Sequence, residues 1–153
     1  MPKPLRRLSR AKVTGMPHPA PDGDWERPRT LAPVVTRAAT PEDLGDHLAD
    51  FLDQMRLLVR QGASRRTLAA ALRPEPPLLG DAVQDAYLAA VAAHLAATHG
   101  IRPPRWTDQP GRRLQRPWFA LPDPWARAWL LRDSPVAFRE RNLFTDVSAL
   151  HRA

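Results

Sequence analysis

The sequence predicts an all-α fold, a small helical domain behind a basic tail that is disordered or extended. Apolar residues recur at helical spacing through residues 40–62 and 80–99, and no segment alternates like a strand. Both segments open with a capping residue and close with glycine. Seven prolines interrupt residues 1–39, as is typical of chains without a packed core. We therefore divide the chain into a tail, 1–39, and a helical domain, 40–153.

Thr40-Pro41-Glu42-Asp43 predicts the start of the first helix. Thr40 is the capping residue, Pro41 takes the first helical position, and Asp43 can return a capping-box bond. Gly62 marks the end of the helix. The apolar stripe between these points consists of Leu44, Leu48, Phe51, Leu52, Met55, Leu58 and Val59.

Two further helices are predicted before residue 100. Ser64 caps a short helix over residues 65–72, which Pro74 terminates. Gly80-Asp81 opens an alanine-rich helix that closes at Gly100, and its alanines permit close helix contact. We expect the helices at 40–62 and 80–99 to form an antiparallel core pair.

The stretch from Pro103 to Phe144 holds four of the five tryptophans. Its prolines predict a stiff loop over residues 102–121. Asp123-Pro124 and Ser134-Pro135 then predict the starts of two short helices. We expect this stretch to fold across the core pair.

These aromatic residues have two interpretations. Large rings at helical spacing usually face a core, but Trp and Arg are also enriched at binding hot spots. On the second interpretation the predicted partner-binding residues are Arg116, Trp118, Phe119, Trp125, Trp129, Arg139 and Arg141.

The formal net charge is +7, and both ends of the chain are basic. Nucleic acid is therefore an alternative partner. Residues 62–72 resemble one helix of a helix-turn-helix, although Pro-Glu-Pro-Pro follows where a tight turn and a recognition helix should be. The predicted nucleic-acid-binding residues are Arg6, Arg7, Arg10, Lys12, Arg65 and Arg66.

Catalytic, metal and cofactor sites are not predicted. The chain has no cysteine, which excludes thiolate chemistry and cysteine-ligated metals. Asp46, Asp50 and Asp53 share one helix face and could hold a hard cation, but we interpret them as a solvated acidic face. No secretory signal or membrane span is recognisable. We expect a cytoplasmic, non-enzymatic protein without a membrane partner.

Four motifs in the second half form a pattern: Glu75-Pro76-Pro77-Leu78-Leu79-Gly80-Asp81, Ala93-His94-Leu95, Arg116-Pro117-Trp118-Phe119 and Asp133-Ser134-Pro135-Val136-Ala137-Phe138-Arg139-Glu140-Arg141-Asn142-Leu143-Phe144. On these motifs residues 75–153 resemble small helical antitoxin-like proteins of GC-rich bacteria, encoded beside nucleotidyltransferase-like toxin genes. The resemblance implies a protein that binds and restrains a protein partner of that type. The alternative is a nucleic-acid-binding regulator that uses the basic tail and residues 62–72.

Overall fold

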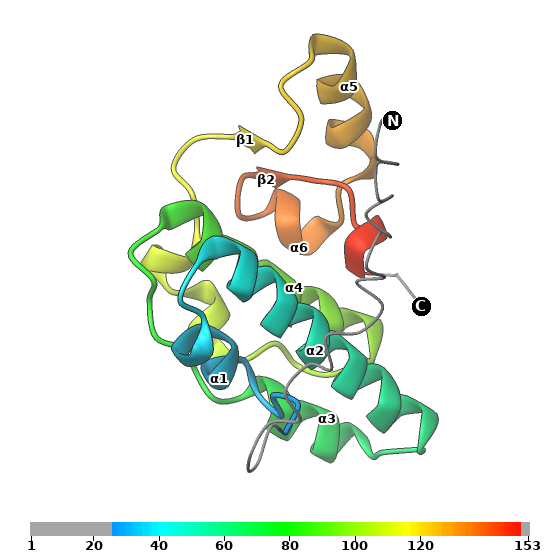
Figure 1. The fold of residues 1–153 in the computed structure, drawn as a ribbon. Helices are drawn as coiled ribbons and strands as arrows, with labels where there is room; N and C mark the ends of the chain where they lie inside the picture. The colour runs from blue at the N-terminus through cyan, green and yellow to red at the C-terminus, as the bar shows by residue number, and fades with distance from the viewer. Residues whose placement is uncertain (1–25, 151–153) are drawn as a thin grey trace, which may run out of the picture.

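The computed structural model describes residues 26–150, and this part is mostly helical, as the sequence predicts (Figure 1). Its helices are α1 (Leu31–Arg37), α2 (Pro41–Arg60), α3 (Arg65–Leu72), α4 (Ala82–Thr98), α5 (Pro124–Asp133) and α6 (Val136–Arg139). The short elements are 3-10 turns η1 (Arg105–Asp108), η2 (Pro110–Arg112) and η3 (Ser148–Leu150), and strands β1 (Trp118–Phe119) and β2 (Leu143–Phe144). None of these helices has the length and apolarity needed to cross a bilayer.

The predicted helix starts before residue 100 are confirmed at atomic detail. α5 begins at Pro124 as expected and α6 at Val136, but neither Asp123 nor Ser134 makes a capping bond. The Thr40 hydroxyl accepts from the Asp43 amide at 3.1 Å, and the Asp43 carboxylate accepts from the Thr40 amide at 3.1 Å, which completes a capping box. Ser64 caps α3 through the Thr67 amide at 3.2 Å. Asp81 caps α4 in the same way.

The division at residue 39 needs correction, because α1 lies before it and belongs to the core. Leu31, Val34 and Val35 are buried in the main hydrophobic cluster. Pro33 obscures this helix in the sequence. It sits in the first turn, where the backbone has no intrahelical N–H bond for proline to remove.

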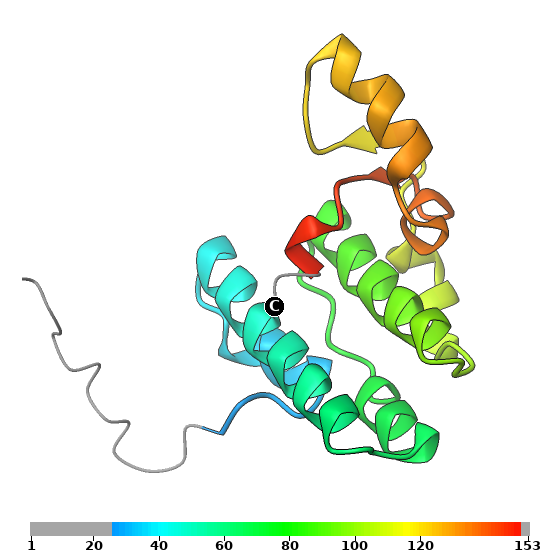
Figure 2. The same ribbon diagram turned by 90° about the vertical axis from the view of Figure 1, so that its right-hand side faces the viewer.

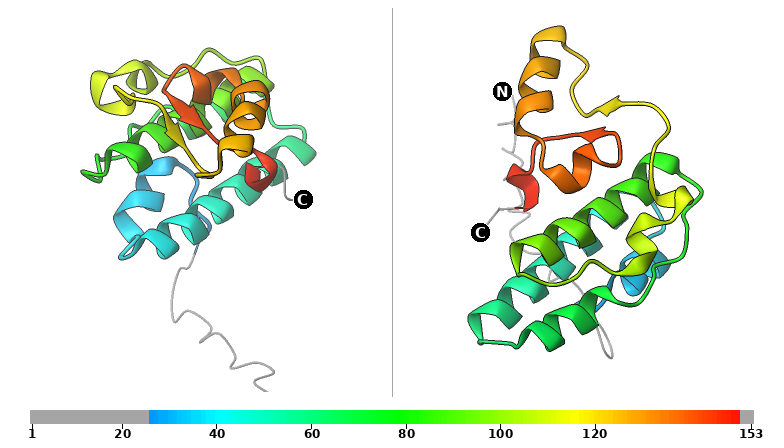
Figure 3. Two further views of the ribbon diagram at one scale, coloured as in Figure 1. Left: turned by 90° about the horizontal axis from the view of Figure 1, so that it is seen from above. Right: turned by 180° about the vertical axis from the view of Figure 1, so that it is seen from behind.

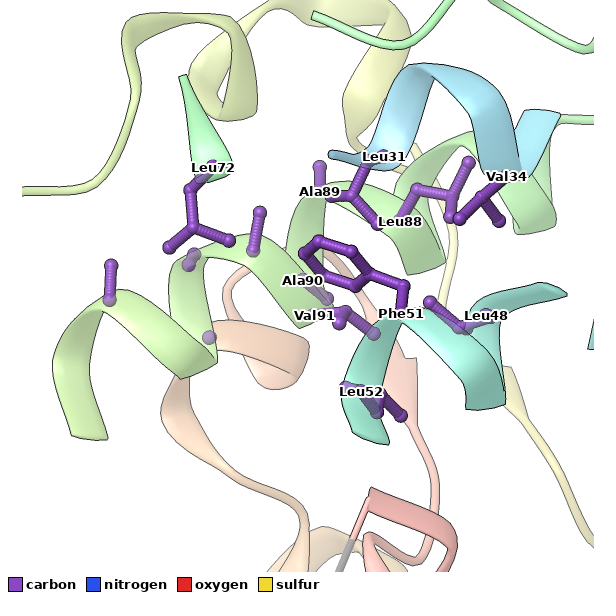
Figure 4. Close-up of a cluster of buried hydrophobic side chains, with 14 of the residues drawn as sticks. Leu31, Val34, Leu48, Phe51, Leu52, Leu72, Leu88, Ala89, Ala90 and Val91 are labelled. Atoms are coloured by element: carbon purple, nitrogen blue, oxygen red, sulfur yellow. The ribbon is translucent and has the colours of Figure 1, made fainter. Parts of the chain in front are cut away.

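Helices α2 and α4 pair through the core but run in the same direction, not antiparallel as expected (Figures 2 and 3). Residues from the C-terminal halves of both helices line one groove. The reason is the path of the chain between them. α3 runs back along α2, and the connector at residues 73–81 continues in that direction to the start of α4. Figure 4 shows Phe51 of α2 pointing toward Ala90 of α4 and Leu31 of α1.

Helix α4 is the centre of the domain. It is contacted by α3, η1, η2, α6 and β2 (Figure 3), and Phe51 of α2 points toward it (Figure 4). Its buried residues include Ala86, Ala89, Ala90, Ala92, Ala93 and Ala96. These small side chains let neighbouring elements approach the helix closely, and most of the helix is buried.

The C-terminal part is held to the core by α6 and carries a projection. Phe138 of α6 packs edge-on against Tyr87 of α4, with ring centroids 5.4 Å apart. β1 and β2 pair in parallel, Trp118 with Leu143 and Phe119 with Phe144. Beyond this pair α5 extends away from the rest of the domain (Figures 1 and 2).

Candidate partner-binding surface

The projecting part of the molecule exposes large apolar side chains. We call residues 118–133, which comprise β1, the following loop and α5, the aromatic lobe. In α5 only Ala126 and Leu130 are buried. The exposed apolar residues of the lobe are Trp118 (36%), Leu121 (40%), Trp125 (72%) and Leu131 (49%). A tryptophan exposed to this extent contributes little to the core and offers its area to a partner.

The other predicted aromatic residues lie closer to the domain. The Phe119 ring stacks on Phe144, with centroids 4.8 Å apart and planes 18° apart. The Arg127 guanidinium covers Phe119 at 5.1 Å from the ring centroid. These contacts leave Phe119 half-buried, and Trp129 is half-buried as well. Both rings offer less area to a partner than Trp125 does.

Positive charge accompanies the exposed rings. Arg116 and Arg139 are exposed and form no ion pair with another described residue. Arg132 instead forms a bidentate pair with Asp133 at 2.7 and 2.8 Å. The hydrogen bonds from Arg132 hold the pKa of the Asp133 carboxyl below its ordinary value.

Arg141 was expected on this surface, but the structure places it inside the domain, where it is 2% exposed. Its guanidinium donates to the Thr107 carbonyl at 2.8 and 3.2 Å and to the Ala137 carbonyl at 2.7 Å. Asp108 accepts a further bond at 3.3 Å. Burial is the main reason that the pKa of Arg141 is lowered. Its role is to join α6 to η1.

A second buried arginine, Arg112, was missed. It is fully buried, lies 5.1 Å from the Trp106 ring centroid, and donates to the Pro76 carbonyl. The buried Asp85 carboxylate lies 3.7 Å from Arg112 and accepts from the Leu79 and Gly80 amides. No local sequence pattern predicts the pairing of Arg112 with Asp85, because the two residues are far apart in the sequence. The Glu75–Asp81 motif is thus the structural connector that this pair holds.

Of the predicted nucleic-acid-binding residues, the structure describes only Arg65 and Arg66. Arg65 and Arg66 are exposed at the start of α3. The helix after α3 is the buried α4, which cannot serve as a recognition helix. Arg6, Arg7, Arg10 and Lys12 lie outside the described residues.

The acidic face of α2 has ordinary roles. Asp53 pairs with Arg56 at 2.6 Å, and Asp43 belongs to the capping box. Burial raises the pKa of Asp50, the largest of several effects. Within residues 26–150, no group of His, Asp and Glu side chains could hold a metal ion.

A groove of about 460 Å³ separates the C-terminal halves of α2 and α4. Its walls include Met55, Val59 and Leu95, and its polar residues include Arg60 and His99. Sequence analysis did not predict this groove, because it results from the parallel pairing of the two helices.

No protein-family model matches this chain, and no curated protein or solved structure matches it either. The arrangement of the described side chains therefore carries the functional argument.

Proposed function

We propose that this chain is a non-enzymatic interaction protein, antitoxin-like, that binds and restrains a protein partner through its aromatic lobe. The exposure of Trp125, together with that of Trp118, Leu121 and Leu131 in the same lobe, carries the proposal. Tryptophan and arginine dominate the energetics of many interfaces, with an apolar centre and a polar rim. The lobe supplies both, because its exposed rings are accompanied by Arg116, two residues before Trp118, and by the exposed Arg127.

The resemblance of residues 75–153 suggests a nucleotidyltransferase-type toxin as the partner. Several residues of the shared motifs have structural roles: Leu79 and Gly80 donate to the Asp85 carboxylate, and Arg141 joins α6 to η1. One shared motif, Arg116–Phe119, leads into the lobe and contributes its exposed Trp118. A protein that only needed stability would not gain from exposing Trp125.

The test is capture of partners from native lysate with the tagged full-length chain, with half the sample treated with nuclease. We expect a stoichiometric protein band that survives nuclease. The variant Trp118→Ala, Trp125→Ala should reduce this band at least tenfold, because truncating a hot-spot residue costs about 2 kcal/mol or more. Leu78→Ala removes an apolar side chain of similar exposure elsewhere and should retain the band.

Equal capture by the lobe variant and the wild type would show that the lobe is not the interface. Loss of all captured material on nuclease treatment would support the nucleic-acid alternative. The melting temperature of each variant serves as the control for folding.

A further inference from the structure

A second charged surface lies away from the aromatic lobe. Figure 2 shows the lobe at the top, and the end of α2, the start of α3 and the end of α4 at the bottom. At or next to these three helix ends lie Arg60, Arg65, Arg66, His99 and Arg102, which we call the basic pole.

A shared groove, one short distance and proximity in the sequence connect the members of the basic pole. Arg60 and His99 line the same groove from opposite helices. The Arg65 guanidinium lies over Gly100, 3.6 Å from where a Cβ at that glycine would be. Arg66 adjoins Arg65, and Arg102 follows Gly100 by two residues.

The pole contains no carboxylate to neutralise it. No Asp or Glu occurs between Asp53 and Glu75, or between Asp85 and Asp108. Asp53, which lines the groove, is already paired with Arg56. The four arginines of the pole form no ion pair with another described residue. The local charge is therefore unbalanced, in contrast to the Arg132–Asp133 pair of the lobe.

We propose that the basic pole binds the phosphate backbone of a nucleic-acid duplex. Guanidinium groups bind phosphate oxygens with two parallel hydrogen bonds. The cations lie at three separate helix ends. This spacing suits a row of phosphate groups better than one small anion. No aromatic residue belongs to the pole, so it lacks the stacking platform that single strands use. It also presents no recognition helix, so binding should be independent of sequence.

This proposal is separate from the partner surface, since no residue of the lobe takes part. The experiment measures anisotropy of labelled duplexes of about 20 base pairs, DNA and RNA, with the full-length chain between about 50 and 200 mM salt. The variant Arg60→Gln, Arg66→Gln, Arg102→Gln should bind at least tenfold more weakly. Its plot of log affinity against log salt should be shallower by about 2 to 3, since each phosphate that is no longer neutralised lowers the slope by about 0.9.

Two matched variants make the result specific. Arg113→Gln, Arg116→Gln, Arg139→Gln removes the same charge from exposed positions elsewhere and should keep most of the affinity. Gln61→Glu places a carboxylate on the exposed turn beside Arg60 and should weaken binding without removing an arginine. A preference for DNA or for RNA identifies the kind of duplex.

Three results would overturn the proposal. They are unchanged binding by the pole variant, equal weakening in the Arg113, Arg116, Arg139 variant, and weakening confined to a variant with Arg6, Arg7, Arg10 and Lys12 changed to Gln. The last result would assign duplex binding to the tail. Thermal melts confirm that each variant is folded.

Discussion

Arg112 and Asp85 are an example of two charged side chains that the fold requires. Both are buried, and between them they hold the backbone of residues 76–80 against α4. Removing one partner of a buried pair leaves the other charge without compensation. The connector, η2 and α4 would then have no common anchor.

We expect Arg112→Leu to lower the free energy of unfolding by about 3 to 5 kcal/mol. The double variant Arg112→Leu, Asp85→Asn should cost less than the sum of the two single changes, since it leaves no unpaired charge. Denaturant unfolding measures both values. Arg113→Leu, at the exposed neighbouring position, is the control and should change stability by no more than about 0.5 kcal/mol. Additive costs would mean that the two charges do not interact.

Asp50 gives a prediction with a defined pH dependence. Burial raises its pKa above the ordinary 3.8, so the folded state binds a proton more tightly than the unfolded state. Its contribution to stability is therefore present at low pH and is lost as pH rises through the folded pKa.

Asp50→Asn should thus stabilise the protein at pH 7 and have no such advantage at pH 3. The gain should be below about 1 kcal/mol, because Asp50 is partly exposed to solvent. Denaturant unfolding at the two pH values tests this, with the exposed Asp46→Asn for comparison. A less stable Asp50→Asn variant at pH 7 would contradict the assignment.

Among the elements, the turn from α6 into β2 depends on one residue. Asn142 has a φ of 59°, a conformation that asparagine tolerates better than most residues. Its side-chain amide donates to the Leu114 carbonyl at 2.7 Å. The turn thereby sets the direction of β2 and the pairing that supports the aromatic lobe.

Glycine and alanine at this position separate the two contributions. Asn142→Gly keeps the backbone conformation and removes the hydrogen bond, at a cost of about 1 kcal/mol. Asn142→Ala removes the bond and adds about 1 to 2 kcal/mol for the left-handed conformation. Denaturant unfolding should show that the wild type is the most stable, Asn142→Gly less stable and Asn142→Ala the least stable. Equal stability of the two would show that backbone conformation contributes nothing here.

At the scale of the whole molecule, local signals predicted helices well. Thr40, Ser64 and Asp81 cap their helices as expected, since capping depends on residues only three positions apart. Helix α1 escaped prediction because two turns with one proline show little periodicity. The prediction that α2 and α4 are antiparallel was wrong, because the direction of α4 depends on the path of the connector.

The candidate surface shows the same limit. Sequence composition identified Trp118 and Trp125 as candidates, and the structure leaves both exposed. Arg116 and Arg141 lie in the same motif-rich region, yet Arg116 is exposed and Arg141 is buried. Only long-range interactions, such as the hydrogen bond of Arg141 to Thr107 across 34 residues, decide between them.

The contrast between α4 and α5 predicts how stability is distributed over the domain. Helix α4 is enclosed by other elements, so its amides should exchange with solvent only on global unfolding. Helix α5 buries only Ala126 and Leu130 and should exchange by local opening, at least about 100-fold faster in its protected amides. Hydrogen exchange followed by mass spectrometry measures both.

Equal protection of α4 and α5 would show that the aromatic lobe is as firmly packed as the core. If the lobe opens locally, binding of a partner at Trp125 must also order it. Protection of α5 should then rise when the captured partner is added, whereas protection of α4 should stay at its global limit. Because α5 carries the exposed Trp125 and buries little, the proposed partner binding can be measured directly as a change in protection at α5.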